Sequence, residues 1–336
     1  METQVTFKVI ICGAGVGGLA LAAFISRNPQ VEVVVYESKP EVSAAGEAIA
    51  IWKRSWQVFQ DMGLDEELAK RNFPTPKEGE VRGPIYRKSD QKEDGYDFHS
   101  HLVPYGLLSI PRPKLLEMLQ AKLGQNCKVL TSKQAIDFVV EDNGTQVAVL
   151  FSDGTRDTAD IVVGADGVHS TTRKWFFTDF ANQQTDPVKA EAYLQLVPPK
   201  WSGTYAYRCN VSAEALEAKF PDHLVWPGQG KVGVSSEKAW LIGSQHVVSY
   251  PFGAVVHFIC YYSPSGETLD TVGDAHVVDV PKQHVIDAFV DWEPEVCGML
   301  ELMNPKVSRW TIFVVEGLPF AVNGRVALSW VIRRMQ

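Results

Sequence analysis

The fold is decided by residues 5–18, which read Val5-Thr6-Phe7-Lys8-Val9-Ile10-Ile11-Cys12 followed directly by Gly13-Ala14-Gly15-Val16-Gly17-Gly18. The first eight residues form the mostly apolar, β-branched run that is typical of a buried strand. Apolar residues at helical spacing follow the glycines, and a second strand-like run, 31–36, ends at Glu37. Strand, glycines, helix, strand and acid in this order predict a βαβ unit that binds a dinucleotide.

Each part of this unit has its own task. Gly13 allows a tight turn, Gly15 lets a pyrophosphate approach the backbone, and Gly18 lets the helix pack closely on the strand. The N-terminus of the helix offers N–H donors to the phosphates. Glu37 follows the second strand, where a carboxylate can accept hydrogen bonds from the ribose hydroxyls of an adenosine. An acid there also repels a 2′-phosphate, so we expect FAD or NAD at this site rather than NADP.

Composition and charge restrict the class of protein. The chain has 336 residues, 45% of them hydrophobic, and a net charge of −8. An acidic chain of this kind is not expected to bind nucleic acid or an anionic membrane. Its five cysteines are scattered and odd in number, which predicts a reducing, cytoplasmic location and no metal cluster. No run of eighteen apolar residues occurs, so we expect no membrane-spanning helix.

A second glycine-containing segment follows the strand-like run 159–163. It reads Gly164-Ala165-Asp166-Gly167-Val168-His169-Ser170-Thr171-Thr172-Arg173. Glycines at the end of a strand let a ligand come close to the backbone, and Asp166 can bind a sugar or fix the turn. Ser170 or Thr171 can cap a helix that begins near Arg173. By itself, the segment permits either a ligand site or a capped turn.

The remaining sequence predicts two domains of an α/β protein. Two strand-like runs, 136–140 and 147–151, flank the turn signal Asn143-Gly144 and predict an inserted β-meander. From about Asn182, antiparallel strand signals alternate with short helices. We expect a Rossmann-like nucleotide-binding domain at 1–73 and 102–181, a loop excursion at 74–101, an antiparallel α+β substrate domain at 182–308, and an incomplete return to the first domain at 309–336.

Three motifs together resemble one family. They are the Gly13–Gly18 loop with Glu37, the segment Ile110-Pro111-Arg112-Pro113-Lys114-Leu115, and the Gly164–Arg173 segment. The chain resembles the FAD-dependent aromatic-ring monooxygenases, which include para-hydroxybenzoate and salicylate hydroxylases, and is most similar to their fungal salicylate-hydroxylase-like branch. The resemblance implies an FAD-binding domain, NAD(P)H as a transient reductant, and hydroxylation of an aromatic or phenolic small molecule with O2.

The resemblance also implies roles for individual residues. In the family, the arginine that matches Arg112 contacts the flavin nucleotide, and the backbone at 46–50, ending at Ala50, lies beside the ribityl chain. The aspartate that matches Asp166 shapes the FAD site and the groove that NAD(P)H visits. Arg208 matches a strand residue that can hold a phenolate or carboxylate substrate, although a surface role is the alternative. Where several relatives have a tyrosine, Trp240 is expected to form an apolar wall.

The sequence departs from the family after Leu328. Relatives continue into a Gly-Asp-Ala-Ala-His segment and a long helix, whereas this chain reads Ser329-Trp330-Val331-Ile332 and ends at Gln336. We therefore expect the chain as given to hold FAD poorly and to hydroxylate weakly. Two alternatives stay open at this point: a non-catalytic or weakly active flavoprotein remnant, and an NAD-dependent oxidoreductase. Bound FAD would make the purified protein yellow and would argue against the second.

Overall fold

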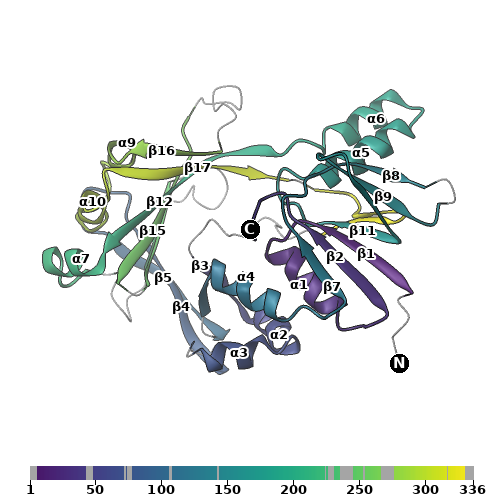
Figure 1. Ribbon diagram of the computed structural model, residues 1–336. Coiled ribbons are helices and arrows are strands. Elements are labelled where there is room, and N and C mark those ends of the chain that lie inside the picture. Colours follow the sequence, from purple (N-terminus) through teal and green to yellow (C-terminus); the bar gives the residue numbers. More distant parts are fainter. Residues whose placement is uncertain are drawn as a thin grey trace. The chain divides into compact units, whose positions relative to one another are not determined.

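The computed structural model describes residues 6–42, 48–71, 73, 78–105, 108–141, 144–223, 225, 231–234, 245–252, 254–265, 276–315 and 317–329. The chain divides into two compact units (Figure 1). Unit 1 comprises Met1–Lys77, Leu107–Pro199 and Val314–Gln336, and unit 2 comprises Glu78–Gly106 and Lys200–Phe313. Each unit has its own sheet and its own hydrophobic core.

Unit 1 is built on a six-stranded sheet. Its strands, in spatial order, are β18 (Val322–Asn323), β19 (Val326–Leu328), β11 (Ile161–Gly164), β1 (Phe7–Cys12), β2 (Val31–Tyr36) and β7 (Cys127–Leu130). All neighbours pair in parallel except β18 and β19. The chain leaves β1 toward β2 on one side and later returns to β11 on the other. This reversal of strand order creates the crevice in which open α/β sheets bind their ligands.

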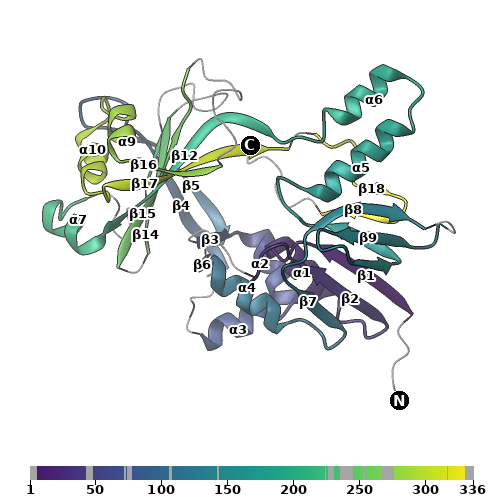
Figure 2. The same cartoon turned by 45° about the horizontal axis from the view of Figure 1, so that its top comes forward.

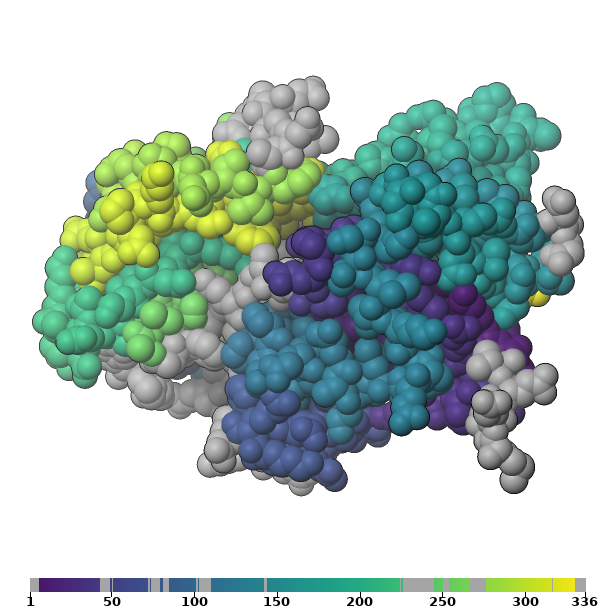
Figure 3. All heavy atoms as spheres, in the orientation of Figure 1, coloured from purple at the N-terminus to yellow at the C-terminus, as the bar shows by residue number. Residues whose placement is uncertain are grey.

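Different layers cover the two faces of this sheet. Helices α1 (Val16–Ile25) and α4 (Arg112–Ala121) lie side by side on one face (Figure 1). The space-filling view shows the N-terminal segment, in purple, packed directly against teal atoms from later in unit 1 (Figure 3). The other face meets an antiparallel sheet of three strands: β8 (Ala135–Val140), β9 (Val147–Phe151) and β10 (Arg156–Ala159). The expected Rossmann-like domain with an inserted β-meander is confirmed.

Short elements complete unit 1. Strand β3 (Ala48–Ile51) pairs antiparallel with β6 (Leu108–Pro111), and these strands lead into α2 (Lys53–Asp61) and α4 respectively. Helix α3 (Leu64–Lys70) follows α2. Helices α5 (Thr171–Asn182) and α6 (Pro187–Leu194) lie side by side and add aromatic side chains to the core (Figure 2).

Unit 2 is built on an eight-stranded sheet that is mostly antiparallel. In spatial order it contains β16 (Val277–Pro281), β17 (Lys306–Val314), β12 (Lys200–Ser212), β15 (Val255–Tyr262), β14 (His246–Phe252), β13 (Lys231–Val234), β4 (Glu78–Lys88) and β5 (Tyr96–Tyr105). Helices α7 (Ala213–Lys219), α9 (Gln283–Ala288) and α10 (Pro294–Glu301) share one core with it.

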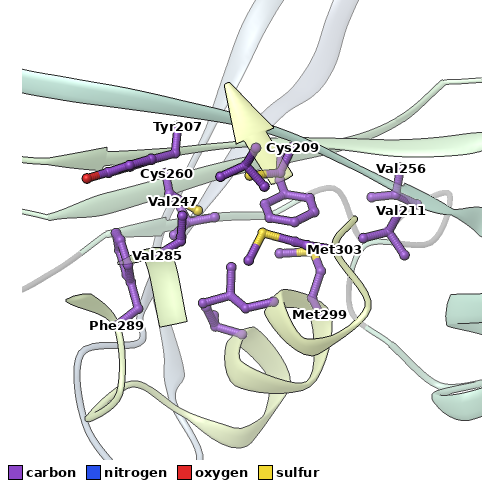
Figure 4. Packing of buried hydrophobic residues seen from close by; sticks show 14 of the residues in the cluster. Tyr207, Cys209, Val211, Val247, Val256, Cys260, Val285, Phe289, Met299 and Met303 are labelled. Atoms are coloured by element: carbon purple, nitrogen blue, oxygen red, sulfur yellow. The ribbon is translucent and has the colours of Figure 1, made fainter. Parts of the chain in front are cut away.

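The two faces of this sheet have different partners because side chains alternate along each strand. Tyr207, Cys209 and Val211 of β12 are buried in the core that the three helices cover, and Figure 4 shows them above Met299 of α10. Arg208 therefore belongs to the opposite side of the strand. We call this side of the sheet, which α7, α9 and α10 do not cover, the second face.

The expected domain boundaries differ from the two compact units in three places. Residues 78–88 and 96–105 are strands of unit 2 and not a loop, so that part of the expectation was wrong. Residues 182–199 belong to unit 1, because α6 packs on α5. Most of β17, including Arg309, belongs to unit 2, because the strand pairs with β16.

Candidate functional site

The three glycines after β1 serve different purposes. Gly13 has φ +109°, and a Cβ atom there would lie 2.4 Å from the carbonyl oxygen of Ala165. A Cβ at Gly18 would lie 1.9 Å from the carbonyl oxygen of Gly13. Both glycines are therefore required by the packing of the protein itself. At Gly15, by contrast, a Cβ would have no protein atom within 4 Å.

Gly15 is also the N-cap residue of α1. Among the described residues, no side chain caps this helix through a hydrogen bond. Open space at Gly15 and uncapped N–H groups in the first turn are what a pyrophosphate requires. The loop therefore fits the phosphates of a dinucleotide.

Glu37 lies at the carboxyl end of β2 and is fixed to the glycine loop. Its Oε2 accepts a hydrogen bond from the N–H of Ala14 at 2.9 Å, and its Oε1 accepts one from the N–H of Lys39 at 3.0 Å. The hydroxyl of Ser38 also donates to Oε1, at 3.2 Å. An ionised carboxylate has about four acceptor positions, so capacity remains for a ribose hydroxyl.

Asp166 fixes the turn after β11. Its Oδ2 accepts hydrogen bonds from the N–H and the hydroxyl of Thr172 at 2.9 and 3.0 Å, and its Oδ1 accepts one from Ser170. Ser170 in turn caps α5 by accepting from the N–H of Arg173 at 2.8 Å. The capped turn is therefore present, and a direct contact of Asp166 with a ligand stays a prediction.

Arg173 has a role that the sequence reading did not identify. Its side chain is buried and donates to the carbonyl of Val168 at 2.6 Å and to the carbonyl of Val197 at 3.0 and 3.1 Å. Burial lowers the pKa of Arg173, and the charge of Asp166 opposes this. The arginine thus ties the Gly164–Gly167 turn to the segment after α6. Its place at the end of the motif was the only signal in the sequence.

Arg112 and Ala50 belong to two segments that strand pairing brings together. Arg112 is the first residue of α4 and is half-buried. The preceding residue, Pro111, pairs with Ala48, and Ser109 pairs with Ala50. The backbone that the family places along the ribityl chain therefore runs beside the start of α4. Residues 46 and 47 lie outside the described residues.

Arg208 lies in unit 2, on the second face of its sheet. Its Cζ atom is 4.2 Å from the centroid of the Trp310 ring. Tyr261, on β15, stacks on His246 at 4.3 Å between ring centroids. Burial raises the pKa of Tyr261, and the positive charge of Arg208 opposes the rise. Trp240, the expected apolar wall, lies outside the described residues.

Five of the predicted residues therefore gather at one edge of the unit 1 sheet. Gly13, Gly15, Gly18, Glu37 and Asp166 surround the carboxyl ends of β1, β2 and β11, where the strand order reverses. The residues present fit an adenine dinucleotide such as FAD, because the loop leaves space for phosphates and the acid has a free acceptor position. Arg208 belongs to the other unit.

Other kinds of chemistry have less support in the part of the chain that the structure describes. No group of three or more metal-ligating side chains occurs among those residues. All five cysteines are free thiols, and burial raises the pKa of Cys12, Cys260 and Cys127, the last to about 11. These thiols are therefore poor nucleophiles. None of the described helices has the length and hydropathy needed to cross a bilayer.

Known proteins share this architecture. The family described as FAD binding domain matches residues 6–209. FAD-dependent monooxygenase str9 of Strobilurus tenacellus is 31% identical, over 98% of this chain and 72% of its own length. Salicylate hydroxylase of Pseudomonas putida is 25% identical, over 97% of this chain and 71% of its own length.

Solved structures agree on the fold. A salicylate hydroxylase in complex with its substrate superposes with a TM-score of 0.74 at 21% identity, covering 98% of this chain and 73% of that one. Klebsiella pneumoniae HpxO complexed with FAD and uric acid superposes with a TM-score of 0.67 at 21% identity, covering 97% of this chain and 73% of that one. The FAD binding domain match spans more than half of the chain, and its glycine loop, acid and capped turn lie where such a domain needs them. The chain therefore belongs to the FAD-dependent monooxygenases.

Proposed function

We propose that this enzyme hydroxylates a small aromatic molecule that carries an anionic group, with NAD(P)H as the reductant and O2 as the source of oxygen. The observation that carries the substrate class is Arg208, a half-buried cation on the second face of unit 2. Among the described residues, no aspartate or glutamate forms an ion pair with it. A partly buried cation without a counter-charge favours an anionic ligand. The relatives named salicylate hydroxylase act on such an aromatic anion.

The residues of this chain bind and orient the reactants. Bound FAD supplies the redox chemistry, namely acceptance of a hydride from NAD(P)H and activation of O2 for insertion of one oxygen atom into the ring. Gly15 and the first turn of α1 bind the pyrophosphate, Glu37 binds the ribose, and Arg208 fixes the anionic group of the substrate. Fixing that group orients the ring and so selects the carbon that reacts. Because all five cysteines are free thiols, the proposal includes a cytoplasmic location.

The test of this function uses the FAD-saturated protein. NADH or NADPH oxidation and O2 uptake are measured with a panel of aromatic carboxylates and phenols, and the products are examined by mass spectrometry. We expect at least one aromatic anion to accelerate both rates and to gain one oxygen atom. Aromatic hydroxylation is wrong if no compound is converted although the flavin is bound and reducible.

Replacing Arg208 by alanine is expected to lower kcat/KM for that substrate by at least about 100-fold, since two charge-assisted hydrogen bonds are lost. FAD content should not change. Arg208→Lys should recover little, because an ammonium group cannot make a planar two-point contact. A variant with wild-type kcat/KM would show that Arg208 is not the anchor.

Replacing Glu37 by alanine is expected to weaken FAD binding by about 10- to 100-fold, because hydrogen bonds from ribose to a carboxylate contribute about 1.5–3 kcal/mol each. Glu37→Gln should lose less, since its amide oxygen can still accept from Ala14. The dissociation constant is measured by titrating FAD into apoprotein, and the melting temperature of each apoprotein serves as the control. Equal affinity of both variants and the wild type would exclude Glu37 from the site.

A further inference from the structure

Trp310 covers one face of the Arg208 guanidinium. The distance of 4.2 Å between Cζ and the ring centroid places the cation over the indole. The strands that carry them, β12 and β17, are neighbours in the sheet. An indole is the aromatic group that attracts a cation most strongly. All hydrogen bonds of a guanidinium lie in its plane, so a stack that holds this plane also fixes the direction of its donors.

Each of the two side chains has a buried N–H group without an acceptor in the part of the chain that the structure describes. Nε of Arg208 and Nε1 of Trp310 are buried and form no hydrogen bond with any described residue. Most buried donors in proteins have an acceptor, so two such atoms in one contact pair indicate a group that the protein does not supply. Guanidinium and indole can only donate. The complementary group must therefore accept hydrogen bonds.

The surroundings of the pair favour an anion further. Tyr261 lies close enough to Arg208 for the charge of the arginine to act on its pKa, and it stacks on His246. The rings of Trp310, Tyr261 and His246 thus give the described surroundings of the cation a largely aromatic character. A carboxylate has two acceptor oxygens in one plane, which match the two-pronged edge of a fixed guanidinium. A phenolate has a single oxygen and cannot make the same two-point contact.

We propose that Trp310 is a positioning residue that holds the Arg208 guanidinium for two-point binding of a substrate carboxylate, and that the enzyme therefore prefers aromatic carboxylates to phenols without one. This inference rests on the proposed role of Arg208 as the substrate anchor. Trp310 itself acts through Arg208, so removing the indole should affect carboxylate ligands selectively.

The sheet offers a matched control on its other face. Arg309 lies over the ring of Tyr205 at 4.5 Å, and Tyr205 belongs to the helix-covered core. Arg309→Met removes an arginine–aromatic contact of the same kind, one residue away from Trp310 in the sequence. Nε of Arg309 also forms no hydrogen bond with any described residue, but its ring partner is on the helix-covered face and not on the second face. Arg309→Met should therefore leave ligand binding unchanged, whatever it does to stability.

The experiment measures dissociation constants by calorimetry on FAD-saturated protein. The ligands are 2-hydroxybenzoate, 3-hydroxybenzoate and phenol, which is the same hydroxylated ring without a carboxylate. The proteins compared are the wild type, Trp310→Leu, Trp310→Phe, Arg309→Met and Arg208→Ala. We expect Trp310→Leu to weaken carboxylate binding by about tenfold or more and phenol binding by less than about twofold. Trp310→Phe keeps a ring under the cation and should fall between Trp310→Leu and the wild type.

Each outcome has a defined meaning. Trp310→Leu could bind the carboxylates with wild-type affinity while Arg208→Ala no longer binds them. This result would contradict the role of Trp310 but would still support Arg208 as the anchor. Wild-type binding by Arg208→Ala would contradict the anchor itself. If the Trp310 variants lose affinity for the carboxylates and for phenol equally, Trp310 is merely structural and the inference is wrong. The inference is also wrong if the wild type binds neither carboxylate more tightly than phenol. If Trp310→Leu does not fold, the test is the loss of carboxylate affinity relative to the loss of phenol affinity in Trp310→Phe.

Discussion

Replacing Gly15 by valine is expected to abolish FAD retention while unit 1 stays folded. A Cβ at this position meets no protein atom within 4 Å, and the backbone angles, φ −71° and ψ −179°, are open to any residue. The added side chain therefore fills only the space that the pyrophosphate needs. Losing two or more charge-assisted hydrogen bonds should weaken FAD binding by at least about 100-fold. Titration of FAD into the wild-type and variant apoproteins, together with their far-ultraviolet circular dichroism, checks both parts.

Gly18→Ala is the matched control for this experiment. Its Cβ would overlap the carbonyl oxygen of Gly13, so this variant should lose folded protein and FAD together. The two glycines are only three residues apart. The Gly15 variant should lose FAD binding and stay folded, whereas the Gly18 variant should lose both. A Gly15→Val protein that binds FAD with wild-type affinity would place the pyrophosphate elsewhere.

The elements that the sequence predicted well are those whose signals are local. The βαβ start was recognised because a strand, a glycine loop and a helix succeed one another within residues 5–25. The hairpin of β8 and β9 was recognised because alternating strands flank Asn143-Gly144. In each case the residues that pair or pack are close in sequence, so their pattern contains the structure.

The loop expected at 74–101 shows why other elements were missed. Gly79, Gly83 and Pro84 suggested a loop, but β4 accommodates them through two register shifts against β5, one between Glu78 and Val81 and one between Arg82 and Ile85. The other neighbour of β4 is β13, at Lys231–Val234, which lies far away in the sequence. A strand whose partner is so distant has no local signal that separates it from a polar loop.

The candidate site was predictable in its residue types but not in its contacts. The motif allowed Asp166 either to bind a sugar or to fix the turn, and only the bonds to Ser170 and Thr172 reveal the second role. Trp310 carried no signal, since its relation to Arg208 depends on which strands become neighbours in the sheet. The roles that the motifs do not specify thus depend on contacts between strands that are distant in sequence.

Replacing Glu293 should strongly destabilise unit 2. The Glu293 side chain is only 2% exposed and contacts Arg87 of β4 at 2.8 Å. The N–H of Gly95, just before β5, donates to the same carboxylate at 2.7 Å. The carboxylate precedes α10 and therefore joins that helix to the β4–β5 hairpin. Removing the Glu293 charge leaves Arg87 with only Asp97, 3.2 Å away and 42% exposed, so most of the compensation of the buried guanidinium is lost.

Glu293→Gln should accordingly lower the free energy of unfolding at neutral pH by about 3 kcal/mol or more. Denaturant titration of the FAD-saturated protein, followed by circular dichroism, measures the change. Asp291→Asn is the control, because the Lys92–Asp291 pair also joins the hairpin to this segment but both side chains are more than 70% exposed. An exposed pair of this kind contributes little, so no measurable change is expected there.

The pH dependence of the difference between wild type and Glu293→Gln identifies its cause. Burial raises the pKa of Glu293, but the hydrogen bonds from Arg87 and Gly95 and the charge of Arg87 outweigh it and bring the pKa below the ordinary value of 4.5. A carboxyl group whose pKa is lower in the folded state stabilises the protein above its unfolded pKa, and this stabilisation is lost as the pH falls through the folded value. The gap between the two proteins should therefore be constant from pH 7 down to about 5 and should shrink below about 4.5. A gap that does not change down to acid pH would mean that Glu293 acts through packing and not through its charge.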